Sequence, residues 1–172
     1  MTGFNNATAS FSGARHDHRH CVSGALAAAA RLCAERGARL TPLRRRVLEL
    51  VWRSHAPIGA YAILEAMAAE QGPTAPPTVY RALDFLLAQG LVHRIESLNA
   101  FVGCVHPDGA HGGQFLICEG CGAAAEVHDP RVDAAVARRA EELGFTVARK
   151  TIEVRGLCPA CGRRRAETGD GG

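Results

Sequence analysis

Apolar residues recur every three or four positions through most of residues 23–89, a spacing that predicts amphipathic helices rather than strands. Start and stop signals divide this pattern, because Ser23 and Thr41 are suitable N-caps and Gly37 and Gly90 end the segments before them. Four helices are therefore expected. They cover residues 23–36, the residues that follow Thr41 with Pro42 in first position, residues 61–71 and residues 76–89.

The pattern changes after Gly90. Two short apolar runs, at 91–95 and 100–104, flank a polar turn and predict a β-hairpin. A helix-turn-helix bundle followed directly by such a hairpin is a winged helix-turn-helix domain, which we place at residues 22–105.

The second half of the chain predicts a separate, smaller unit. Short apolar runs and one helical segment indicate strands at 115–118, 123–128 and 146–156 and a helix at 130–143. The expected fold class is thus α+β, with a small α+β dimerisation and metal-binding domain at 114–162 after a linker at 106–113. Residues 1–21 and 163–172 lack periodicity and are expected to be disordered tails.

Composition and charge narrow the possible partners. The chain has 172 residues with 47% apolar content, which is typical of a globular protein, and no apolar run approaches the roughly 18 residues of a membrane span. Residues 1–95 carry eleven arginines against six acidic residues, a net charge of +5, whereas residues 96–172 carry nine basic against eleven acidic residues, a net charge of −2. The first half is therefore the better match for a polyanion such as DNA.

The fourth predicted helix has the features of a DNA-recognition helix. Its apolar residues centre on one side, while Tyr80 and Arg81 lie on the other, where they could reach base edges or phosphates in a major groove. Arg44, Arg45 and Arg46 lie in the first turns of the second helix, where the helix dipole disfavours positive charge. This placement indicates an external anion, although solvated surface arginines explain it equally well.

Four of the seven cysteines form two Cys-x-x-Cys pairs separated by 36 residues, and each pair is followed by glycine. This spacing is typical of a zinc site in a reducing compartment rather than of disulfides. A cage of four thiolates has no open position, so we expect a permanent structural zinc. Its ligands are Cys118, Cys121, Cys158 and Cys161.

A second set of potential ligands is mixed in type and comes from separate predicted elements. His93, Cys104, His111 and Glu126 offer a thiolate, two imidazoles and a carboxylate, which suit tetrahedral Zn²⁺ better than a hard cation. Such a site forms only when its elements come together, so its occupancy is coupled to conformation. We therefore expect a regulatory zinc here. His106 and His128 flank the set and are alternative ligands.

The order of these motifs resembles the ferric uptake regulator superfamily, and its zinc-sensing branch in particular. The resemblance rests on residues 77–83 (PTVYRAL), residues 90–93 (GLVH) and the paired Cys-x-x-Cys motifs, and it covers about residues 23–162. It implies a cytoplasmic, homodimeric bacterial repressor that binds double-stranded operator DNA, with two Zn²⁺ per chain and no enzymatic activity. It also implies the two ligand sets given above, a recognition pair at Tyr80 and Arg81, and phosphate contacts by Arg44 and Tyr61.

Other interpretations remain open within and outside the family. A regulator of the same superfamily could sense another metal, such as iron, nickel or manganese, or peroxide, and a zinc-ribbon interaction adaptor would explain the cage but not the basic half. A zinc nucleoside deaminase is disfavoured because Leu157 stands where its signature requires proline. The iron-sensing branch typically has a His-rich run before the first Cys-x-x-Cys pair and a further histidine before the second. This chain has residues 110–114 and Lys150-Thr151 at these places, so a third metal site is not expected.

Overall fold

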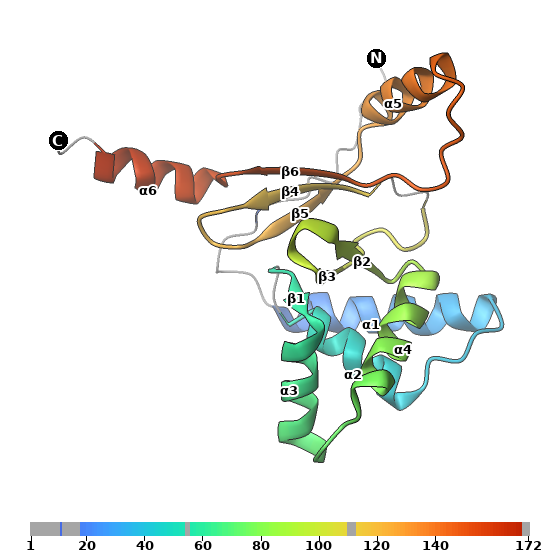
Figure 1. Cartoon of the computed structure of the whole chain (residues 1–172). Coiled ribbons are helices and arrows are strands. Elements are labelled where there is room, and N and C mark those ends of the chain that lie inside the picture. The colour runs from blue at the N-terminus through green and yellow to red at the C-terminus, as the bar shows by residue number, and fades with distance from the viewer. Residues whose placement is uncertain (1–10, 12–17, 54–55, 110–112, 170–172) are drawn as a thin grey trace.

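The computed structural model describes residue 11 and residues 18–53, 56–109 and 113–169. Figure 1 shows a helical part below and a second part, built on its own sheet, above. The first part comprises α1 (His18–Glu35), α2 (Pro42–Val51), β1 (Ile58–Gly59), α3 (Ala60–Gln71), α4 (Pro76–Ala88), β2 (Val92–Ile95), the 3-10 helix η1 (Glu96–Leu98) and β3 (Ala100–Gly103). The second part comprises β4 (Gln114–Cys118), β5 (Ala124–Val127), α5 (Pro130–Glu142), β6 (Ile152–Gly156) and α6 (Pro159–Gly169).

The helices of the first part pack around one core because each turns its apolar stripe inward. At α2 the predicted cap is present: the Thr41 side chain accepts a hydrogen bond from the Arg44 amide, and Pro42 opens the helix. Cys33 of α1 is buried in this core. The buried residues of α2 and α4 are Val47, Leu48, Leu50, Val51, Val79, Ala82, Leu83 and Leu86.

The hairpin of β2 and β3 follows α4, and β1, from the segment before α3, completes a three-stranded antiparallel sheet in the order β1-β3-β2, the wing. No sequence pattern predicts β1, because two residues are too few to show alternation. The sheet approaches α2 closely at Gly103, where a Cβ atom would lie 2.2 Å from Cε2 of the Trp52 indole. A residue without a side chain is therefore required for the indole to pack on the wing.

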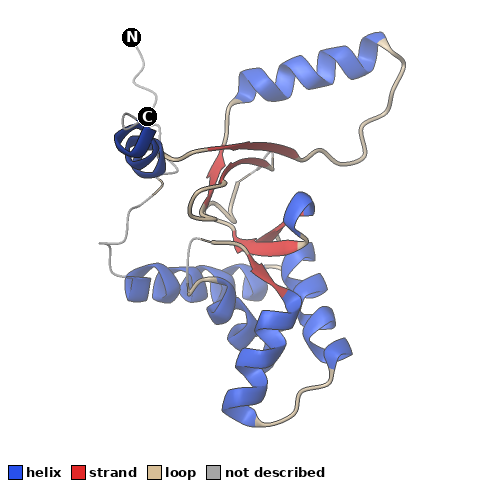
Figure 2. Ribbon diagram, turned by 60° about the vertical axis from the view of Figure 1, so that its left-hand side comes forward, coloured by secondary structure: helices blue, strands red, loops and turns tan. Residues whose placement is uncertain are grey.

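The second part has a three-stranded sheet in the order β5-β4-β6. β5 runs antiparallel to β4 after a tight turn, whereas β6 runs parallel to β4 and so requires a crossover connection. That crossover contains α5, which Figure 2 shows standing away from the sheet. No residue of α5 is buried. The exposed large apolar residues of this part are Leu116, Val132, Val136, Leu143, Phe145, Val147, Val154 and Leu157.

A separate apolar cluster joins the two parts where their sheets meet. Ile95 of β2 packs with Phe115 and Ile117 of β4 and with Ala124 of β5, and Val102 of β3 borders the cluster. Ile95 and Phe115 are completely or almost completely buried. We call this cluster the interdomain seam. It holds the wing against the second sheet, so the hairpin is the structural link between the two domains.

The two predicted tails and one strand differ from the structure. α1 begins at His18 rather than at Ser23, because the Ser23 hydroxyl donates to the His20 carbonyl within the helix instead of capping it. The chain from 163 to 169 is helical, because α6 begins in the second Cys-x-x-Cys turn and extends it. β6 covers only 152–156 of the predicted 146–156 strand.

Candidate metal centres and nucleic-acid interface

Four cysteines converge at one end of the second sheet. Cys118 ends β4 and Cys121 lies in the following turn, while Cys158 follows β6 and Cys161 lies in the first turn of α6. Their sulfur atoms all lie within 4.8 Å of one another, and the Cys121 and Cys158 sulfurs are 3.9 Å apart. A tetrahedral zinc with Zn–S bonds of about 2.3 Å requires sulfurs about 3.8 Å apart. The four residues therefore fit a Cys₄ zinc site.

Backbone geometry prepares this cage for a metal. The two Cys-x-x-Cys turns match, because the Gly122 amide donates to the Cys118 carbonyl and the Gly162 amide to the Cys158 carbonyl, both at 2.8 Å. The Cys158 amide also donates to the Cys118 sulfur at 3.2 Å and is the main cause that lowers the pKa of this thiol to about 6. At Gly120 a Cβ atom would lie 2.9 Å from the Cys161 Cβ, so a side chain there would push the turns apart.

A second donor cluster lies at the junction of the two domains. His93 on β2 and Cys104 just after β3 come from the winged domain, and Glu126 on β5 comes from the second domain. Their ligand atoms lie within 4.8 Å of one another, and His93 Nε2 is 2.9 Å from Glu126 Oε1. His111, the fourth predicted ligand, lies outside the described residues. His106 and His128 are exposed and do not belong to the cluster.

The chemistry of this cluster suits a cation. Cys104 is almost fully buried, and its burial, with the neighbouring Glu126 charge as the next cause, raises the pKa of its thiol to about 12. A thiolate and a carboxylate side by side in a buried site repel each other unless a positive charge lies between them. Sulfur, imidazole and carboxylate donors together favour Zn²⁺ over Mg²⁺ or Ca²⁺. The three residues therefore fit a zinc ion whose binding joins the two domains.

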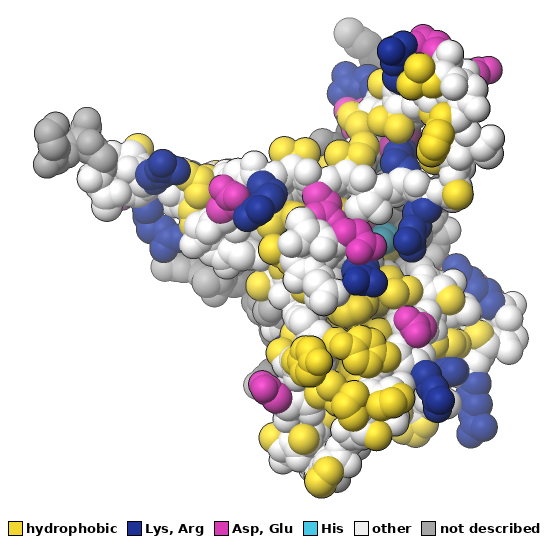
Figure 3. Space-filling model, viewed as in Figure 1, with side chains coloured by type: hydrophobic (Ala, Val, Ile, Leu, Met, Phe, Trp, Pro, Cys, Tyr) yellow, Lys and Arg dark blue, Asp and Glu magenta, His cyan; other side chains and the backbone are white. Residues whose placement is uncertain are grey.

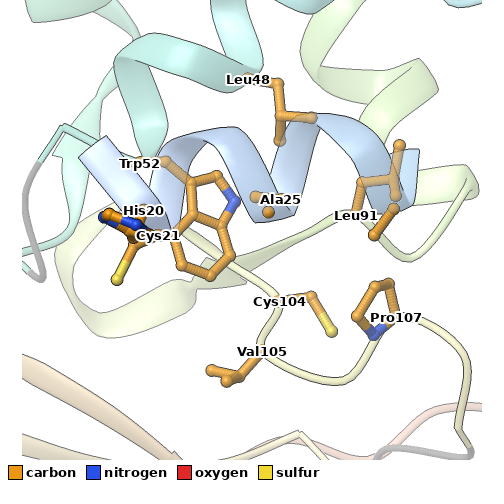
Figure 4. A pocket seen from close by; sticks show the side chains of 11 residues that line it. His20, Cys21, Ala25, Leu48, Trp52, Leu91, Cys104, Val105 and Pro107 are labelled. Carbon is orange, nitrogen blue, oxygen red and sulfur yellow. The ribbon is translucent and has the colours of Figure 1, made fainter. Parts of the chain in front are cut away.

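Backbone contacts connect this cluster to the end of α4. The Cys104 amide donates to the Leu91 carbonyl at 3.0 Å, just after the last turn of α4, and the Val105 amide donates to Glu126 Oε2 at 3.1 Å. A cavity of about 260 Å³ lies beside Cys104 and is bordered by Trp52 and the first turns of α1. Figure 4 shows the indole between α1 and the segment that carries Cys104.

Arg31 of α1 and Arg36, which directly follows α1, hold the start of the linker, a role that no sequence motif indicates. The Arg31 guanidinium binds both oxygens of Asp108 at 2.8 Å, and Arg36 donates to the Gln89 carbonyl at 2.5 Å and to the Pro107 carbonyl at 3.4 Å. Arg36 therefore contacts both the end of α4 and the linker. These partners lie more than fifty residues away along the chain, so only the fold brings them together.

The predicted recognition residues face outward from the winged domain. Tyr80 and Arg81 are exposed on α4, and Tyr61 is exposed at the start of α3. Among the described residues, the side chains of Tyr80 and Arg81 form no hydrogen bond or ion pair with the rest of the chain. Figure 3 shows apolar side chains gathered on this part of the molecule, over α3 and α4.

The three arginines of α2 differ in their surroundings. Arg45 is exposed and 3.6 Å from Glu49, whereas the Arg44 guanidinium lies over the Phe85 ring at 3.6 Å. The Arg46 guanidinium forms ion pairs with Glu49 and Glu70, so a contact with a DNA phosphate, which stays a prediction for Arg46, would compete with these pairs. Since Glu70 lies on α3, Arg46 links two helices of the winged domain.

The fold and the two donor clusters define a two-domain winged-helix protein of the metal-responsive regulator class. The profile of the ferric uptake regulator family matches residues 35–155, and the chain belongs to this family. It is 42% identical to the zinc uptake regulation protein of Escherichia coli (strain K12) over 137 residues, 79% of this chain and 80% of that protein. It is also 30% identical to the peroxide operon regulator of Bacillus subtilis (strain 168) over 76% of this chain and 88% of that protein.

Two solved structures have the same fold over most of the chain. A zinc uptake regulator in complex with zinc and DNA superposes with a TM-score of 0.81 at 40% identity, covering 84% of this chain and 97% of that chain. The holo form of XcZur superposes with a TM-score of 0.76 at 46% identity, covering 83% of this chain and 99% of that chain. In the described part of this chain, no helix is both long enough and apolar enough to cross a membrane.

Proposed function

We propose that this protein is a cytoplasmic, zinc-responsive transcriptional repressor that binds operator DNA as a zinc-loaded homodimer and controls zinc uptake genes. The observation that carries the proposal is the cluster of His93, Cys104 and Glu126, with Cys104 buried and the other two partly buried, which spans both domains and suits Zn²⁺. Zinc and DNA are both bound by the structurally similar zinc uptake regulator. Two zinc ions per chain are proposed, one structural and one regulatory, and no catalytic role.

The structural zinc belongs to the four cysteines at the end of the second sheet. These residues tie the end of β4 to the start of α6, two segments about forty positions apart. A zinc ion there supplies the positive charge that lets four thiolates share one small space. This cage stabilises the second domain, through which two chains associate.

The regulatory zinc belongs to His93, Cys104 and Glu126, with His111 proposed as the fourth ligand. Because two donors come from the winged domain and one from the second domain, these residues lie together only in one relative orientation of the domains. A zinc ion supplies the charge that stabilises that orientation. The Cys104 amide, bonded to Leu91, extends the effect to the end of α4.

The same orientation sets the distance between the two α4 helices of a dimer. A two-fold operator requires recognition helices about 34 Å apart, or a multiple of that distance. We assign base contacts to Arg81, with Tyr80 beside it, and phosphate contacts to Arg45, Tyr61 and, more weakly, Arg44. Arg81 has its donors available, whereas Arg44 is partly engaged with Phe85.

Fluorescence anisotropy tests this proposal. A duplex enriched from a random pool by the zinc-loaded protein is compared with an unselected duplex, before and after chelation and with Zn²⁺, Fe²⁺ or Mn²⁺ added back. We expect tight, sequence-selective binding that Zn²⁺ restores at the lowest free concentration. Restoration by Fe²⁺ or Mn²⁺ with loss on peroxide treatment supports a peroxide-sensing regulator instead. Absence of DNA binding under every condition supports an interaction adaptor.

A further inference from the structure

A carboxylate of the second domain binds the wing at a place remote in sequence. Glu153 lies on β6, and its Oε1 accepts a hydrogen bond from the Glu96 amide at 2.6 Å. Its Oε2 accepts a second bond from the Ser97 amide at 3.1 Å. Glu96 and Ser97 begin η1, the 3-10 helix between β2 and β3. One side chain of the second domain therefore caps the turn of the wing.

The contact satisfies groups that the wing cannot satisfy by itself. The first amides of a 3-10 helix have no partner inside the helix, and no side-chain cap is formed by Ile95, the N-cap residue of η1. Two charge-assisted hydrogen bonds to one carboxylate are stronger than neutral ones. Partial burial raises the pKa of Glu153, but the bonds from Ser97 and Glu96 outweigh it, so the pKa lies below its ordinary value. Glu153 is therefore held as a carboxylate.

Glu153 also lies beside the interdomain seam. It is paired in register with Phe115 on the neighbouring strand, and Phe115 packs against Ile95, the residue that precedes Glu96. The apolar seam and the polar contact are thus adjacent parts of one interface. Neither part includes a donor of the metal cluster.

We propose that Glu153 is a positioning residue for operator binding, which fastens the wing to the second domain in the DNA-competent orientation. The inference rests on the function proposed above. When the domains adopt another orientation, the carboxylate and the two amides no longer bind each other and are hydrated instead. The contact therefore favours only one of the two orientations. A contact that favours the zinc-binding orientation must also strengthen zinc binding, by linkage. Glu153 therefore acts together with zinc without being a ligand.

Two pairs of matched variants separate this role from general effects on folding. Glu153→Gln keeps the length of the side chain and removes its charge, and Glu141→Gln removes a charge from an exposed position on α5. Glu96→Pro removes one of the two amide donors at the first position of η1, where proline is tolerated and the extended Ile95 can precede it. Glu96→Gln keeps that amide while removing the side-chain ion pair with Arg94.

The measurements are operator affinity at saturating zinc, affinity for unselected DNA, and zinc affinity by chelator competition without DNA. We expect Glu153→Gln and Glu96→Pro each to weaken operator binding and regulatory zinc binding by about tenfold. The two matched controls and binding to unselected DNA should change less than twofold. The double variant should lose less than the sum of the two single losses, because both substitutions weaken the same contact.

Several outcomes overturn the inference. These are parental operator and zinc affinities in Glu153→Gln, equal losses on operator and unselected DNA, or additive effects in the double variant. Loss of the cage zinc in Glu153→Gln also overturns it, because the residue would then support the second domain itself. If the parent protein shows no zinc-dependent operator binding, the proposed function fails. The zinc titrations without DNA still test the contact in that case.

Discussion

Removal of the Cys104 sulfur tests whether the junction cluster is the sensing site. Cys104 is the one thiol of the cluster and is almost fully buried. Cys33 is a matched control, because its thiol is equally buried but lies in the core of the winged domain, away from both clusters. The variants Cys104→Ala and Cys33→Ala therefore each delete one buried sulfur, and only the first deletes a ligand.

The expected loss of zinc affinity follows from the size of the ligand set. A four-ligand zinc site contributes about 10–16 kcal/mol, so one ligand accounts for roughly 2.5–4 kcal/mol. Since about 1.4 kcal/mol is a factor of ten, Cys104→Ala should weaken the regulatory site by roughly 10² to 10³-fold. To raise the fraction of protein in the DNA-binding orientation from about 1% to about 99%, zinc must bind that orientation more tightly by about 5.5 kcal/mol. A loss of roughly 2.5–4 kcal/mol therefore removes much of the zinc response. The cage zinc should remain.

Proton release on zinc binding gives a second, independent test of whether Cys104 is a ligand. Because burial and the Glu126 charge raise the pKa of the Cys104 thiol to about 12, this group is protonated near pH 7 without metal and must lose its proton to bind zinc. Raising the pH therefore favours binding, and this proton alone contributes about tenfold in zinc affinity per pH unit. Cys104→Ala should release one proton fewer per zinc, whereas Cys33→Ala should match the parent.

Calorimetric titration in buffers of different ionisation enthalpy counts these protons, and chelator competition gives the affinities. Trp52, the single tryptophan of the chain, lines the same cavity as Cys104 and should report occupancy by fluorescence. Parental zinc affinity and proton count in Cys104→Ala would refute the assignment. A similar loss in Cys33→Ala would show that stability, rather than ligation, was measured.

Three further predictions concern the rest of the molecule. Cys158→Ser should destabilise or unfold the second domain, since the roughly 2.5–4 kcal/mol lost with one ligand is a large part of a typical domain stability of about 5–15 kcal/mol. A variant that keeps two zinc ions and the parental melting temperature, by metal analysis and circular dichroism, would contradict the cage. Arg81→Ala should cost about 1–3 kcal/mol of binding free energy on operator DNA alone. Arg45→Ala should instead weaken binding to all duplexes and reduce the slope of log affinity against log salt by about one. Equal losses for Arg81→Ala on operator and unselected DNA in anisotropy titrations would exclude base reading. Gly103→Ala should destabilise the winged domain by about 1–3 kcal/mol, because its methyl group overlaps the Trp52 ring, and an unchanged melting temperature would contradict this close approach.

The sequence predicts those parts of the molecule whose causes are local or strictly spaced. Thr41 and Pro42 mark the start of α2 because capping depends on neighbouring residues. The apolar stripe of α4 identifies its outer face, and with it Tyr80 and Arg81. Spacing alone predicts the cysteine cage. Each Cys-x-x-Cys turn brings its own two sulfurs together, and two such pairs supply the four ligands of one zinc ion.

Contacts between distant segments have no such local signal. Arg46 directly follows Arg45 in the same arginine run, and only the position of α3 shows that Glu70 engages Arg46 and not Arg45. The bond from Glu96 to Glu153 joins residues 57 positions apart and requires both domains to be placed first. The helical C-terminal segment is similar, because its polar sequence gives no periodicity and its first turn is fixed by the cysteine cage.

The second sheet ends in β6, whose outer edge has no neighbouring strand among the described residues. Apolar side chains such as Val154 lie on this strand, and Leu143 and Phe145 lie exposed on the crossover segment before it. An open strand edge beside apolar surface is a template for aggregation in an isolated subunit. Because dimerisation would cover this surface, the melting temperature should rise with protein concentration in the dimerising range. When few chains are present, most of them would be monomers and would be the most exposed to proteolysis. The amount of active protein would then increase more than proportionally with its rate of synthesis.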